Sequence, residues 1–129
     1  MPAPASAIFS NALNILAQTD VLAAIDAGAA AGVLKIYTEA DTLLGTITLA
    51  DPAGTVHGTT GQLTITAPST VASVATGTAT WAEVEDSDGT SVVQIPVSAG
   101  ASAVSGQCVL SSVSIQSGAD LELISFTIG

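Results

Sequence analysis

After Gly32, apolar side chains recur at about every second position, with threonine, serine or other polar residues between them. This period of two is that of a β-strand, in which successive side chains point to opposite faces. The sequence therefore predicts about seven or eight short strands. The stretches that carry the pattern are residues 33–37, 42–49, 63–66, 77–85, 92–97, 109–115 and 121–128.

Turn-forming residues separate the predicted strands. Residues 51–54 read Asp-Pro-Ala-Gly, residues 86–89 read Asp-Ser-Asp-Gly and residues 117–120 read Ser-Gly-Ala-Asp. Such residues favour tight turns, and short strands that turn at regular intervals are typical of two packed antiparallel sheets. We therefore expect a mainly β fold, an antiparallel β-sandwich or jelly roll, over residues 29–129.

A helical segment is expected before the strands, over residues 6–28, and an N-terminal arm of residues 1–5 precedes it. Ser6 can cap its start and Gly28 can end it, while Thr19 and Asp20 offer a second cap that would divide it into two short helices. Its apolar residues recur at three- and four-residue steps along one face: Ile8, Phe9, Ala12, Leu13 and Leu16, with Leu22 and Ile25 continuing this face less strictly.

The chain carries eleven acidic residues and one basic residue, Lys35, which give it a net charge of −10. Binding to nucleic acid or to an anionic membrane draws on clustered cations, so neither is an expected partner. The N-terminus lacks the basic start and long apolar run of a secretory signal, and no stretch of about twenty residues is apolar enough to span a bilayer. The lone Cys108 cannot form an intrachain disulfide, which fits a protein made in a cytoplasm.

Side chains that carry out catalysis are scarce, since the chain has one His, one Cys and one Lys. We therefore expect neither an enzyme nor a bound cofactor or metal. His57 is predicted to lie on the surface, and Cys108 to be a small buried hydrophobic residue. Asp86, Asp88 and Gly89 resemble part of a calcium-binding loop, but no Glu follows at the position of the bidentate ligand, which favours a plain hairpin turn.

Trp81 lies between small residues in the middle of a predicted strand, so it is expected to be the largest part of the core rather than an exposed platform for a sugar. Glu83 and Glu85 share its strand face and would repel each other there. Such a cluster is usually solvated, but it could also dock onto a basic groove of a partner.

Four segments of the chain carry a resemblance to a known family: residues 32–37 (GVLKIY), 43–52 (LLGTITLADP), 75–81 (ATGTATW) with 86–90 (DSDGT), and 112–128 (SVSIQSGADLELISFTI). Together they resemble small structural proteins encoded in the virion-assembly regions of tailed bacteriophages and prophages. The likeness covers most of the chain after Gly28. The chain departs from the family pattern in a shorter connection after Tyr37 and in Glu83 after Trp81.

The resemblance implies a virion structural protein, of the kind that decorates or cements a capsid at the contacts between capsomers. Such a protein is made in the host bacterial cytoplasm and reaches the capsid surface, where a homo-oligomer, a dimer or trimer, binds the major capsid protein by non-covalent contacts. The alternatives are a tail or baseplate subunit and a sugar- or calcium-binding β-sandwich module. The helix face either contacts a neighbour or covers one end of its own sandwich. The residues expected to contact a partner are Ile8, Phe9, Leu13, Leu16, Glu83 and Glu85.

Overall fold

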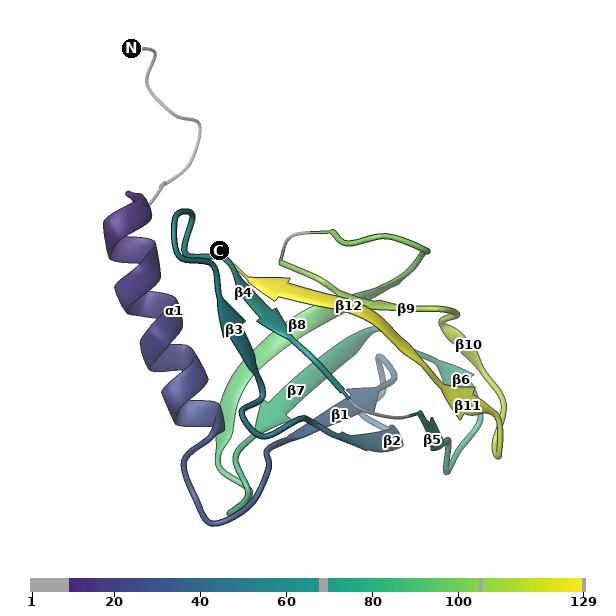
Figure 1. Ribbon diagram of the computed structural model, residues 1–129. Helices are drawn as coiled ribbons and strands as arrows, with labels where there is room; N and C mark the ends of the chain where they lie inside the picture. Colours follow the sequence, from purple (N-terminus) through teal and green to yellow (C-terminus); the bar gives the residue numbers. More distant parts are fainter. Residues whose placement is uncertain (1–9, 68–69, 105, 129) are drawn as a thin grey trace.

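The computed structural model describes residues 10–67, 70–104 and 106–128, in which the chain forms one helix and twelve strands (Figure 1). The helix is α1 (Asn11–Ile25). The strands are β1 (Val33–Tyr37), β2 (Leu43–Thr48), β3 (Gly54–Val56), β4 (Leu63–Ile65), β5 (Val71–Ala72), β6 (Gly77–Thr78), β7 (Trp81–Glu85), β8 (Ser91–Ala99), β9 (Cys108–Leu110), β10 (Ser114–Ile115), β11 (Asp120–Leu121) and β12 (Leu123–Ile128). The expected mainly β fold with a helix near its N-terminus is confirmed.

Eight of the strands pair into one sheet in the order β2-β1-β7-β8-β9-β12-β4-β3, and two short ribbons, β10-β6 and β11-β5, accompany it. The prediction of a purely antiparallel fold is wrong, because β8 and β9 run parallel, with Val97 opposite Cys108. The chain doubles back between Ala99 and Cys108, so that β9 begins beside the end of β8. A two-residue period shows that a strand exists, but it does not show which strand it pairs with or in which direction.

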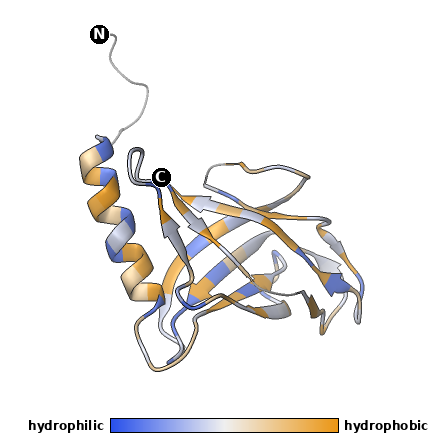
Figure 2. Ribbon diagram, in the orientation of Figure 1, coloured by the Kyte–Doolittle hydropathy of each residue, from blue (hydrophilic) through white to orange (hydrophobic). Residues whose placement is uncertain are grey.

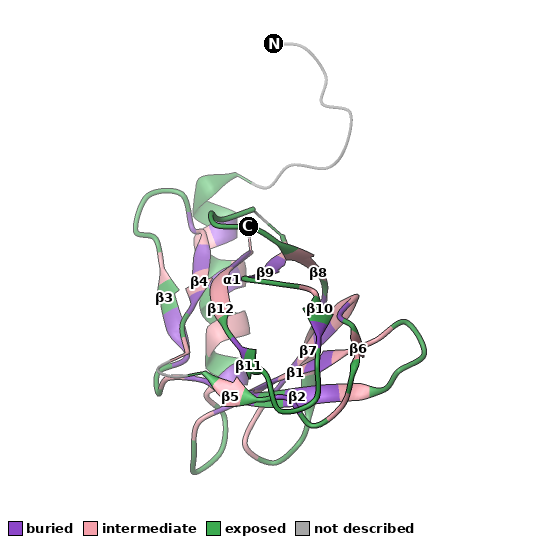
Figure 3. Cartoon of the chain, turned by 90° about the vertical axis from the view of Figure 1, so that its right-hand side faces the viewer, coloured by how far each residue is buried: buried purple, intermediate pink, exposed green. Residues whose placement is uncertain are grey.

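The main sheet is curled, as Figures 1 and 3 show. β2 and β3 form its opposite edges, yet only residues 49–53 join them. A connection of that length spans at most about 20 Å, so the two ends that it joins have to lie close together. The backbone N–H of Ala50 donates to the carbonyl oxygen of Thr66 at 3.0 Å, which ties the connection to the residue after β4. The expected two-layer sandwich or jelly roll is therefore not confirmed.

The core is built from the inward side chains of the curled sheet and from the end of α1, where Ile25 is buried and Val21 and Leu22 pack against it. Phe126, on β12, is the largest of the side chains with almost no exposed surface, and Ile25 contributes from the helix. Figure 3 shows the buried segments distributed over the strands rather than gathered in one of them. The largest of the fully buried side chains are Phe126, Ile25, Leu34, Ile36, Leu44, Ile47, Leu49, Leu63, Leu110, Leu121, Val84 and Val109.

Three of the predicted strands are divided in the structure. Residues 77–85 form β6 and β7, residues 109–115 contain the end of β9 and all of β10, and residues 121–128 form the end of β11 and all of β12. At each break the shorter piece leaves the main sheet and pairs in one of the two ribbons. The period of two also misses β3 and β5, which are three and two residues long and therefore too short to show an alternation.

α1 is one continuous helix. Ser10 caps its start, because the side-chain Oγ accepts a hydrogen bond from the backbone N–H of Leu13 at 3.2 Å. The alternative of two short helices is wrong, because Thr19 lies inside the helix and its hydroxyl donates to the carbonyl oxygen of Ile15 at 2.6 Å. Three residues after the helix, Gly28 takes a φ of +111°, a conformation that favours glycine.

Part of the expected helical segment falls outside the described residues. This holds for Ser6, Ile8 and Phe9, and for the expected arm of residues 1–5. Within the described part of the chain, no helix combines the length and the apolar character that a membrane crossing requires.

Candidate functional site

The side of α1 that faces the sheet is polar over its first half. Asn14 and Gln18 are buried there, with 7% and 6% of their surface exposed, and Ile25 is buried near the helix end. A helix advances by about 100° per residue, so these three residues lie on one side and Leu13 and Leu16 point away from it.

The opposite side of α1 is apolar and exposed. Leu13 keeps 50% of its surface exposed and Leu16 keeps 66%. The alternative in which the leucines cover one end of the same domain is wrong for Leu13 and Leu16. Figure 2 shows hydrophobic bands along the helix. We call this surface the outward face of α1; its exposed residues are Ala12, Leu13, Leu16, Thr19, Asp20, Ala23 and Ala24.

Specific contacts fix the orientation of α1. The side-chain amide of Asn14 donates to the carbonyl oxygen of Thr60 at 2.9 Å, and that of Gln18 donates to Asn14 Oδ1 at 3.3 Å. Gly61 has a φ of +78°, and a Cβ atom there would lie 2.5 Å from the backbone nitrogen of Ile15. The loop between β3 and β4 therefore lies directly against the helix, and only glycine allows this approach.

His57 organises the same loop. Its Nδ1 accepts hydrogen bonds from the backbone N–H groups of Thr59 and Thr60, at 3.2 and 3.1 Å. The side chain is exposed, as predicted from the sequence. His57 thus fixes the loop in which the carbonyl oxygen of Thr60 accepts the hydrogen bond from Asn14. The role of His57 next to the helix is therefore structural.

Trp81 lies on the outer face of the sheet, and the prediction that it forms the core is wrong. Ala82 and Val84 of the same strand are buried, so the odd-numbered residues of β7 point the other way. Trp81 is partly exposed and stacks on Tyr37 of β1, with ring centroids 4.4 Å apart and an interplanar angle of 14°. Its Nε1 donates to the carbonyl oxygen of Thr38 at 3.0 Å, which fixes the indole.

Glu83 and Glu85 lie on the same side of the sheet as Trp81, as predicted, but Glu83 is partly exposed whereas Glu85 is buried, with 8% of its surface exposed. Lys35 relieves their repulsion, since its Nζ lies 3.0 Å from Glu85 Oε1, and this hydrogen bond raises the pKa of Lys35 above its ordinary value of 10.5. Glu83 accepts a hydrogen bond from Nε2 of Gln94 at 3.1 Å. Side-chain hydrogen bonding with Glu85 and then with Gln94 lowers the pKa of Glu83 from its ordinary value of 4.5, so Glu83 is a carboxylate at neutral pH.

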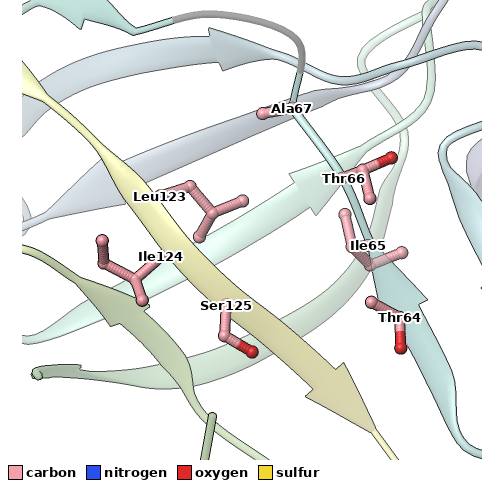
Figure 4. Close-up of a pocket in the computed structure, with 7 residues that line it drawn as sticks. All are labelled: Thr64, Ile65, Thr66, Ala67, Leu123, Ile124 and Ser125. Carbon is pink, nitrogen blue, oxygen red and sulfur yellow. The ribbon is translucent and has the colours of Figure 1, made fainter. Parts of the chain in front are cut away.

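A cleft of about 250 Å³ opens between β4 and β12 (Figure 4). The two strands pair at Thr64 and Thr127, and the described ladder ends there, so the strands separate beyond this point. The lining side chains offer hydroxyl and aliphatic groups and carry no acid, base or thiol, so they can bind a ligand but cannot transfer protons. They are Thr64, Ile65, Thr66, Ala67, Leu123, Ile124 and Ser125.

The acidic turn between β7 and β8 is a hairpin turn, as predicted. Asp86 Oδ1 accepts hydrogen bonds from the backbone N–H groups of Asp88 and Thr90, at 3.0 and 2.9 Å, and Gly89 has a φ of +87°. The carboxylate of Asp86 thus stabilises the turn itself. Among residues 10–67, 70–104 and 106–128, no three His, Cys, Asp or Glu side chains come together as a metal site would require.

Cys108 is fully buried, as predicted, and burial raises the pKa of its thiol to about 12. We expect a thiol-specific reagent to label the native protein far more slowly than the denatured chain, because only the exposed thiolate reacts. The fold favours the neutral thiol, so its contribution to stability is present below pH 9.0 and is lost as the pH rises toward about 12. Denaturant titrations of Cys108→Ala over the same pH range should lack this component. Labelling of the native protein as fast as that of the denatured chain would contradict the burial of Cys108.

The predicted partner-binding residues that the structure describes belong to two surfaces, while Ile8 and Phe9 lie outside the described residues. Leu13 and Leu16 lie on the outward face of α1, while Glu83 and Glu85 lie on the outer face of the sheet. Sequence reasoning missed Tyr37 and Gln94, which complete the second surface. The signal was the alternation along each strand, which places both residues at outward positions beside Glu83 once the strands are paired. Comparison with protein-family models, with curated proteins and with solved structures found no match to this chain.

Proposed function

We propose that this protein is a structural component of a tailed-phage particle, a capsid decoration or cement protein that binds the major capsid protein by non-covalent contacts. It acts as a dimer or trimer, so that each copy contributes a modest apolar contact at a seam between capsomers. The sequence segments that resemble phage structural proteins suggest the particle. The outward face of α1 supplies a surface for the contact.

The observation that carries the proposal is the exposure of Leu13 and Leu16 on a helix whose orientation is fixed. Full burial of a leucine side chain is worth about 1.5–3 kcal/mol, so turning these residues inward would stabilise the isolated chain. Instead the helix buries Asn14 and Gln18 and presents Leu13 and Leu16 to solvent. Large apolar side chains that gather on one exposed face are typical of an interaction surface.

Cryo-electron microscopy of the particles made by the phage or prophage that encodes the chain tests this function. We expect density that fits the curled sheet and α1 on the outside of the head, with the outward face of α1 against the shell. Density only on the tail or baseplate would exclude the capsid role and favour the tail alternative. Particles in which mass spectrometry finds no copy of the chain would exclude both.

A further inference from the structure

The outer face of the sheet carries an apolar row that crosses four strands. Leu43 of β2 lies opposite Tyr37 of β1, Tyr37 lies opposite Trp81 of β7, and Trp81 lies opposite Pro96 of β8. Tyr37 covers one face of the indole, so the other face is turned toward the β8 side. All four side chains keep part of their surface exposed.

A polar row runs beside the apolar row on the same face. In it Lys35 lies opposite Glu83, and Glu83 lies opposite Gln94. Two residues along a strand span about 7 Å, so the carboxylate of Glu83 and the indole of Trp81 lie within reach of one bound group. Glu83, Gln94 and Trp81 together offer a carboxylate, an amide oxygen and an aromatic face.

The charge on this face indicates which chemical group binds beside Glu83 and Trp81. Glu83 and Glu85 bring two negative charges and Lys35 brings one positive charge, which leaves a net charge of −1 on this face in a chain of net charge −10. Lys35 is the only Lys or Arg of the sequence and its ion pair is with Glu85, while Glu83 accepts a hydrogen bond from the neutral amide of Gln94. A guanidinium can pair with a carboxylate through two parallel hydrogen bonds and also stack on an indole.

We infer that the outer face around Trp81, Glu83 and Gln94 is a docking surface for arginine side chains of a partner protein. The guanidinium pairs with Glu83, donates a hydrogen bond to the amide oxygen of Gln94 and stacks on the face of Trp81 that is turned away from Tyr37. This inference rests on the proposed function and deepens it, because it adds a second contact surface and gives the chemistry of the partner that this surface fits.

Trp81 is the only tryptophan of the chain, so its fluorescence reports binding at this surface directly. The purified protein is titrated with a short capped oligoarginine peptide and with the same peptide in which citrulline, a neutral isostere, replaces arginine. We expect saturable quenching by the arginine peptide alone. Equal binding of the citrulline peptide, or a response to a neutral disaccharide such as maltose but not to arginine, overturns the inference.

Three variants separate the site from the overall charge. Glu83→Gln should weaken binding about tenfold or more, since it removes the charged hydrogen-bond partner. Asp20→Asn removes the same charge from the exposed helix and should change the affinity less than about twofold. Gln94→Lys places a cation opposite Glu83, where it should keep the fold intact and abolish binding. Equal losses in Glu83→Gln and Asp20→Asn, or unchanged binding by Gln94→Lys, overturn the inference.

The peptide titration does not depend on a phage particle, so its outcome is separate from that of the proposed function. If the protein occurs on the capsid but shows no arginine-dependent quenching, this docking surface is wrong and the capsid role stands. If the quenching behaves as expected but no particle contains the protein, the docking surface stands and the capsid role is wrong.

Discussion

A protein in which glutamate replaces both Leu13 and Leu16 is expected to fold as the natural chain does and to lack the proposed binding to a phage head. Full burial of each leucine is worth about 1.5–3 kcal/mol, so the double variant should bind roughly a hundredfold more weakly or worse. The free energy of unfolding should change by no more than about 0.5 kcal/mol per site, because both side chains are exposed in the isolated chain. Co-sedimentation with heads that lack the protein measures the first quantity, and urea denaturation measures the second.

The matched control places the same two charges on exposed apolar residues elsewhere. Val74 and Val104 have 67% and 45% of their surface exposed and lie in loops far from α1 in the sequence. Replacing both by glutamate adds the same charge without touching the outward face of α1, so binding to heads should persist. If the control variant lost binding as severely as the double leucine variant, general charge repulsion would explain the loss, and the outward face of α1 would have no special role.

Phe126→Ala is expected to reduce the free energy of unfolding by about 3–5 kcal/mol, since it removes a fully buried aromatic side chain and leaves a cavity. A domain of this size has a total stability of about 5–15 kcal/mol, so the variant should lose a large share of its stability. Urea denaturation of the purified proteins measures the difference. Leu16→Ala, a truncation of an exposed residue, serves as the control and should cost about 0.5 kcal/mol or less. A cost below about 1 kcal/mol for Phe126→Ala would contradict the described core.

The strands could be predicted well because their signal is local. The alternation in residues 33–37 and 42–49 corresponds to β1 and β2, and the turn at residues 86–89 joins β7 to β8. The pairing of the strands could not be predicted, because it depends on how the whole sheet curls. The pair of Val97 and Cys108 is an example. The same holds for the breaks, at which β6, β10 and β11 leave the main sheet.

Two features of the sequence give opposite predictions for Trp81: the strand alternation places it on the outer face, and the size of the indole favours the core. The alternation already placed Trp81 with Glu83 and Glu85, and two carboxylates on one face argue that this face meets water. The expectation of a core position rested on the large area that an indole can bury. In the structure the small Ala82 and the branched Val84 take the inner positions, and Trp81 buries part of its surface against Tyr37 instead.

Composition and local periodicity suffice to show that this protein is mainly β, that its helix ends before Gly28, and that it carries one cation against eleven acidic residues. The folded structure is needed to see which side of α1 is buried and which carboxylate Lys35 meets. The reason is that both depend on contacts between residues far apart in the chain. Asn14 faces inward because Thr60 and Gly61 lie against the helix. Lys35 forms its ion pair with Glu85 and not with Glu83.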